Sequence, residues 1–64
     1  MHMIRFIRKQ RGITVKELAT SARVSPMSIY RYEQGKRTPT VEVAARLAAA
    51  LRCTVDDLIE KPSA

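Results

Sequence analysis

The chain has 64 residues and a formal net charge of +6, and 45% of its residues are hydrophobic. A chain of this length forms one domain that buries only about 60% of its unfolded surface, which excludes a large core. The single cysteine excludes an internal disulfide and a cysteine-based zinc site, and no apolar run approaches the roughly 20 residues that span a bilayer. We therefore expect a small helical domain in the reducing cytoplasm, without signal peptide or membrane segment, whose positive charge indicates a polyanionic partner.

Residues 4–11 form the first predicted helix. Ile4 and Ile7 lie on one face at helical spacing, and basic residues occupy the last turn, where the helix dipole favours them. Gly12 follows as the residue that ends the helix. Residues 1–3, before this helix, are expected to be a flexible terminus.

The second predicted helix begins after Thr14, because Thr14 and Glu17 have the spacing of a capping box. In this arrangement each side chain accepts a hydrogen bond from the backbone amide of the other residue. Ile13 and Leu18, on either side of the cap, have the spacing of a hydrophobic staple. The apolar face of this helix consists of Val15, Leu18, Ala19 and Ala22.

The third predicted helix begins at Ser25 and Pro26, a cap residue followed by a proline whose missing N–H does no harm there, and ends at Gly35. With about 100° of rotation per residue, the helix has two distinct faces. The residues of the inner face are Ile29, Tyr32 and Glu33. The residues of the outer face are Met27, Arg31 and Gln34, followed by Lys36 and Arg37. An apolar side chain, a guanidinium and an amide that face outward suit contacts with base edges and phosphates.

Thr40 is expected to cap a fourth helix over residues 41–51. Its predicted buried stripe consists of Val41, Ala44, Leu47, Ala48 and Leu51. Further alanines make this helix apolar nearly all round, which reflects either the helix propensity of alanine or a partner-binding face. Thr54 and Asp57 have the spacing of another capping box and predict a last short helix to about residue 60. The residues expected to anchor it are Val55, Leu58 and Ile59, and residues 61–64 are expected to be a flexible tail.

Two stretches resemble the helix-turn-helix of the lambda-repressor-like family, which includes phage repressors, Cro proteins and many small bacterial regulators. Residues 15–34 resemble the motif itself, with Ala19, Ile29 and Tyr32 at matching positions. The sequence RYEQGKRTP at residues 31–39 is similar to the family signature R-Y/W-E-N-G-K-R-x-P at the end of the recognition helix. The resemblance covers residues 4–59 and implies an all-α domain of five helices with the helix-turn-helix as helices 2 and 3.

Apart from Gln34, where the signature has asparagine, the chain departs from the family pattern at three positions. Arg23 and Arg52 stand where glycine is usual, and Val15 stands where glutamine often holds a phosphate. A phosphate contact or a modest loss of stability would both be compatible with arginine at position 23. Val15 leaves only backbone amides at the start of its helix for a phosphate.

The resemblance implies a transcriptional regulator that binds double-stranded DNA sequence-specifically, most often a repressor that reads a palindromic operator through the major groove. The residues that it implies as base contacts are Pro26, Met27, Ser28 and Arg31. The residues that it implies as phosphate contacts are Thr14, Val15, Ser25, Tyr30, Gln34, Lys36, Arg37 and Thr38. In the phage repressors an arginine at the position of Arg8 pairs with a glutamate at the position of Glu33, and the alternative here is two solvated surface charges.

We expect a weak homodimer that becomes firmer on DNA, formed through the C-terminal half near Leu58 and Ile59. The alternative function on the same fold is a protein-interaction module, such as an antitoxin or a coactivator. An enzyme is not expected, because one histidine near the N-terminus and one cysteine supply no convergent catalytic groups. We likewise expect no cofactor, no metal site and no small-molecule ligand.

Overall fold

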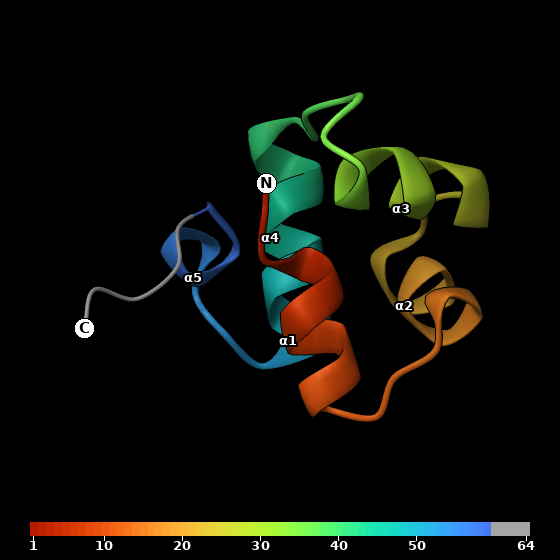
Figure 1. Ribbon diagram of the computed structural model, residues 1–64, viewed down its shortest axis with the longest axis vertical. Coiled ribbons are helices and arrows are strands. Elements are labelled where there is room, and N and C mark those ends of the chain that lie inside the picture. Colours follow the sequence, from red (N-terminus) through yellow and green to blue (C-terminus); the bar gives the residue numbers. More distant parts are fainter. Residues whose placement is uncertain (60–64) are drawn as a thin grey trace.

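The computed structural model describes residues 1–59, which contain five α-helices and no strand. The helices are α1 (Ile4–Gln10), α2 (Val15–Ala22), α3 (Pro26–Glu33), α4 (Val41–Leu51) and α5 (Val55–Ile59). In Figure 1, α1 crosses in front of α4, α2 and α3 lie together on one side of this pair, and α5 lies on the other. The predicted all-α fold of five helices is therefore confirmed. The expected end of the last helix near residue 60 and the tail 61–64 lie outside the described residues.

Two reciprocal capping boxes fix the starts of α2 and α5. The Thr14 hydroxyl accepts from the Glu17 amide at 3.1 Å, and the Glu17 carboxylate accepts from the Thr14 amide at 3.0 Å. Thr54 and Asp57 repeat this exchange at 3.1 and 3.0 Å. These hydrogen bonds hold the pKa values of the Glu17 and Asp57 carboxyl groups below their usual ranges, because they favour the charged form. Both predicted boxes are confirmed.

After each of the helices α1 to α4, one residue of the following turn adopts the left-handed backbone conformation. Gly12 and Gly35 have φ angles of 67° and 72°, where glycine meets no steric penalty. Arg23 and Arg52, at the C-caps of α2 and α4, have φ angles of 59° and 58°. A side chain in this region costs ~1 kcal/mol relative to glycine, so both arginines strain the turns they occupy.

An arginine of α4 and the C-cap arginine of α1 bind the C-terminal ends of α2 and α4. Arg46 Nε donates to the carbonyl oxygen of Ala22 at 2.7 Å, and its Nη1 donates to Glu42 at 3.0 Å. Arg11 Nε donates to the carbonyl oxygen of Leu51 at 3.0 Å. A guanidinium at a helix C-terminus satisfies an orphan carbonyl and faces the negative end of the helix dipole. These contacts join helices that are distant in the sequence.

The core is one cluster of apolar side chains to which all five helices contribute. Its fully buried large side chains are Ile4, Leu18, Ile29, Leu47, Leu51 and Leu58. The amide of Met3 donates to the carbonyl oxygen of Leu58 at 3.1 Å, and Met3 packs partly against the core. The start of the chain is thereby held against α5. Between residues 1 and 59, no helix has the length and apolar content needed to cross a membrane.

Two apolar residues that were expected in the core are exposed. Val41 was predicted in the buried stripe of α4, but 88% of its surface is exposed. It is the first residue of α4, and helical side chains lean toward the N-terminus, so Val41 extends beyond the packed part of the helix. Ile59 was expected to anchor α5, but it is 40% exposed because it points about 100° away from the buried Leu58.

Candidate nucleic-acid interface

The helix α3 is fixed by one face and presents the opposite face to solvent. Ile29 and Tyr32 are buried, with 0% and 4% of their surfaces exposed. Met27 is 58% exposed, and Arg31 and Gln34 are also exposed. The inner and outer faces predicted from helical spacing are therefore present. The anchored helix thus leaves a thioether, a guanidinium and an amide facing solvent.

The four residues expected to contact bases lie within residues 26–31 of α3. Pro26, Met27 and Arg31 are exposed and Ser28 is half-buried. The Ser25 hydroxyl accepts from the Ser28 amide at 3.1 Å and lies 3.0 Å from the Ser28 hydroxyl. The N-terminal cap of α3 therefore orients Ser28, while the other three side chains are free to reach outward.

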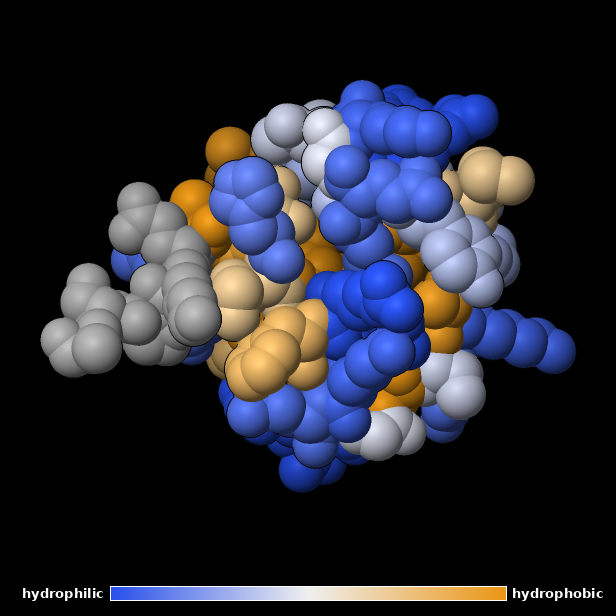
Figure 2. All heavy atoms as spheres, in the orientation of Figure 1, coloured by the Kyte–Doolittle hydropathy of each residue, from blue (hydrophilic) through white to orange (hydrophobic). Residues whose placement is uncertain are grey.

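The residues expected to hold phosphates lie on both sides of the exposed face of α3. Their exposed members are Thr14, Ser25, Tyr30, Gln34, Lys36, Arg37 and Thr38. Val15 is half-buried and packs against the core, so only its backbone amide, in the first turn of α2, can serve an external anion. Figure 2 shows hydrophilic side chains gathered over α3 and the loop that follows it, at the upper right of the view.

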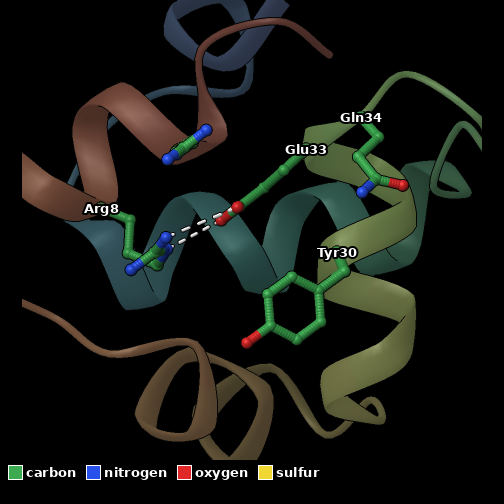
Figure 3. Close-up of a pocket in the computed structure, with 5 residues that line it drawn as sticks. Arg8, Tyr30, Glu33 and Gln34 are labelled. Atoms are coloured by element: carbon green, nitrogen blue, oxygen red, sulfur yellow. Dashed lines mark hydrogen bonds and ion pairs between the residues drawn. The ribbon is translucent and has the colours of Figure 1, made fainter.

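Arg8 and Glu33 join α1 to the end of α3. Arg8 Nε donates to Glu33 Oε2 at 2.7 Å and Nη2 donates to Oε1 at 3.4 Å, the fork geometry visible in Figure 3. Arg8 Nη1 also donates to the carbonyl oxygen of Ile13 at 3.1 Å. The two side chains are only 12% and 6% exposed, so the pair is nearly buried and its charges are not a pair of solvated surface groups.

A hollow of about 230 Å³ lies between α1 and α3 beside this ion pair. Its lining residues are Arg5, Arg8, Tyr30, Glu33 and Gln34. Figure 3 shows the Tyr30 ring and the Gln34 amide on the α3 side of the pair. Arg5 was not among the residues predicted at the site. The available signal was its position three residues before Arg8, which puts both arginines on neighbouring parts of α1.

A family model described as helix-turn-helix matches residues 4–58. The chain belongs to the helix-turn-helix family. Its motif comprises α2, the turn through Arg23 and α3, as the sequence predicted. The predicted resemblance to lambda-repressor-like members is confirmed by this match and by the relatives described next.

Among curated proteins, the HTH-type transcriptional regulator DdrOP3 of Deinococcus deserti is 33% identical to this helix-turn-helix chain over 57 residues. The match takes in 89% of the chain but only 44% of the relative. The chain therefore spans less than half of the length of this regulator.

Solved structures share the fold. The clp gene regulator ClgR from Corynebacterium glutamicum has a TM-score of 0.80 at 34% identity, over 88% of this chain and 73% of that one. The N-terminal DNA-binding domain of SinR from Bacillus subtilis has a TM-score of 0.83 at 25% identity, over 100% of both chains. The fold of this chain is thus that of a helix-turn-helix DNA-binding domain. These relatives are named as regulators and a DNA-binding domain rather than as enzymes.

The described part of this helix-turn-helix domain offers little for catalysis or metal binding. No group of three or more histidine, cysteine, aspartate or glutamate side chains within residues 1–59 could hold a metal ion. Burial and the nearby Asp57 carboxylate raise the pKa of the Cys53 thiol. Cys53 is half-buried and packs against the apolar core.

Proposed function

We propose that this helix-turn-helix domain belongs to a transcriptional regulator and binds double-stranded DNA sequence-specifically, with α3 in the major groove. The observation that carries the proposal is the exposed face of α3, which bears Met27 and Arg31 on a helix anchored by Ile29 and Tyr32. A major groove admits one α-helix, and side chains of these types read base edges there. The net charge of +6 favours a polyanion.

Base readout is assigned to residues 26–31 of α3. Arg31 donates its guanidinium fork to O6 and N7 of a guanine, and Met27 packs against a thymine methyl group. Pro26 and Ser28 lie close to base edges, and the Ser28 hydroxyl is oriented by Ser25. Arginine is the side chain that suits a bidentate contact, because lysine keeps the charge but lacks the fork.

Phosphate contacts surround this reading face and set its register on the duplex. They are assigned to the Val15 amide and to the side chains of Thr14, Ser25, Tyr30, Gln34, Lys36, Arg37 and Thr38. The loop of residues 36–38 places two cations directly after α3. These contacts supply affinity without sequence preference, and they make binding sensitive to salt.

The most direct regulatory role for such a domain is repression from a palindromic operator. One recognition helix covers only a few base pairs, so a two-fold dimer on two half-sites is the simplest route to useful discrimination. A dimer that fills successive major grooves denies the same DNA to other proteins. This finer assignment rests on the proposed groove contacts.

Selection of bound duplexes from a random library tests the proposal. We expect enrichment of one sequence pattern with two-fold symmetry, and a binding constant for that duplex that falls steeply with salt concentration. The control is a scrambled duplex of equal length and composition, which should bind far more weakly at the same salt concentration. Enrichment of no pattern would reject sequence-specific binding, and a pattern without two-fold symmetry would reject the palindromic operator.

A further inference from the structure

The hollow beside the Arg8–Glu33 pair borders the proposed groove-reading face. Tyr30 and Gln34 line it from α3, and Arg5 and Arg8 line it from α1. At helical spacing, Gln34 lies within about 20° of Met27 around α3, so the hollow adjoins the surface that faces DNA in the proposed function. α1 therefore lies next to that surface, although none of its residues was counted among the DNA contacts.

The charge of the hollow comes from Arg5. Arg8 is held by both Glu33 oxygens and by the Ile13 carbonyl oxygen, so the two buried charges neutralise each other. Arg5 is exposed and makes no ion pair within residues 1–59. The hollow thus combines a balanced ion pair with one guanidinium that has no ion-pair partner among residues 1–59.

Hydrogen-bond donors on the α3 side complement this guanidinium. The Tyr30 side chain is 48% exposed and offers a hydroxyl, and Gln34 offers an amide N–H. Neither side chain is engaged in a hydrogen bond within the described residues. A cation and two neutral donors around a concave surface match an anion with several acceptor oxygens.

We propose that the hollow seats one backbone phosphate of DNA and that Arg5 is the residue that binds it. Arg5 would extend the phosphate-binding surface from the helix-turn-helix onto α1. In this arrangement α1, together with α2, helps to fix the register of α3 in the groove. This inference rests on the proposed DNA-binding function. It adds Arg5, and a phosphate contact on α1, to the contacts assigned to the exposed face of α3.

The test compares Arg5→Gln with Arg52→Gln on the highest-affinity duplex from the selection. Each variant removes one positive charge from an exposed position. Arg52 lies at the C-cap of α4 and is not among the assigned DNA contacts, so it serves as the control for loss of net charge. We expect Arg5→Gln to reduce the slope of log affinity against log salt by about one, with unchanged base preference. Arg52→Gln should leave the slope nearly unchanged.

A second arm assigns the contact to a single phosphate. Neutral methylphosphonate is placed at one position at a time in the same duplex, and its effect on affinity is measured for both proteins. At one position the substitution should weaken wild-type binding at least several-fold but should weaken Arg5→Gln binding much less. Tyr30→Phe should show the same non-additivity at that position. Thermal denaturation of each variant checks that its fold is retained.

The outcomes separate this inference from the function on which it rests. If the wild-type protein selects no duplex, the proposed function fails and the phosphate seat fails with it. If the wild-type protein binds its duplex but the salt slopes of Arg5→Gln and Arg52→Gln fall equally, only the role of Arg5 is overturned. If methylphosphonate weakens binding of the wild type and of Arg5→Gln equally at every position, the role of Arg5 is likewise overturned.

Discussion

Arg31 is the single side chain on which the proposed sequence preference depends most. It is exposed in the last turn of α3, and nothing within residues 1–59 holds its guanidinium in an ion pair. Arg31→Ala should weaken binding to the selected duplex by ~1–3 kcal/mol and relax the preference at one base pair. Arg31→Lys should lose the preference while retaining more of the affinity. Affinities for a set of single-base-pair variants of the duplex provide the measurement, and an equal loss on every sequence would make Arg31 a phosphate contact.

The Arg8–Glu33 pair gives a prediction about stability rather than recognition. Because the Glu33 side chain is only 6% exposed, Arg8→Ala leaves a nearly buried carboxylate without its cation. We expect a loss of ~3–5 kcal/mol in the free energy of unfolding, measured by urea denaturation. The matched control is Glu42→Ala, which breaks a pair whose carboxylate is 84% exposed and should cost less than ~1 kcal/mol. Similar small losses in both variants would mean that water screens the inner pair.

At the scale of helices and turns, an arginine in a left-handed C-cap lowers the stability of the domain relative to glycine. Arg52 occupies a φ angle of 58° that glycine adopts without strain. Arg52→Gly should raise the stability by up to ~1 kcal/mol, which is a rise of about 4–8 °C in melting temperature for a domain of this size. Arg52→Ala removes the same charge but keeps the strained backbone, so it should bring no such gain. Equal melting temperatures for the two variants would show that the strain is negligible.

The two capping boxes make stability depend on pH. Their hydrogen bonds lower the pKa values of Glu17 and Asp57 in the folded state, so their stabilisation is complete above the unfolded values of roughly 4 and is lost as pH falls through the folded values. The variant Glu17→Gln/Asp57→Asn keeps hydrogen-bonding side chains but removes both ionisations. We expect the wild type to be more stable at pH 7 and its advantage to shrink between about pH 5 and pH 3. Urea midpoints across this range measure the effect, and a constant difference would contradict it.

The starts of helices were predictable because capping is local. Each capping box pairs residues only three positions apart, so its residue types and spacing can be recognised in the sequence. The two pairs are Thr14 with Glu17 and Thr54 with Asp57. The failure at Val41 has the opposite origin. α4 is apolar nearly all round, so spacing alone could not say which side chain at its first turn would find a neighbour.

Contacts between distant residues were mostly beyond prediction. The bond from Arg46 to the Ala22 carbonyl oxygen joins residues 24 apart, and the sequence contains no local pattern for it. The ion pair of Arg8 and Glu33, 25 residues apart, was expected only because of the family resemblance. Arg5 was missed as a lining residue because an arginine on an outer helix looks like an ordinary solvated charge until α3 is placed beside it.

At the scale of the whole molecule, the apolar surface that α5 offers for assembly is small. Leu58 was expected near the dimer surface, but it is fully buried in the monomer core. Ile59 is 40% exposed on the same helix and remains available. One partly exposed side chain and its surroundings fall short of the roughly 800 Å² per partner that a stable interface buries. A dimer formed through α5 should therefore be weak unless DNA holds both copies at adjacent half-sites.

Sedimentation equilibrium, with and without the selected duplex, tests this assembly. We expect a monomer–dimer equilibrium in free solution and two protein copies on each duplex, with half-sites about 34 Å apart. Ile59→Asp should abolish the dimer in solution and lower the cooperativity of binding, because it places a charge in an apolar contact. Ile59→Val keeps that contact apolar and should retain both properties. One protein copy bound to a duplex without two-fold symmetry would rule the dimer out, and an Ile59→Asp variant that still dimerises would place the interface elsewhere.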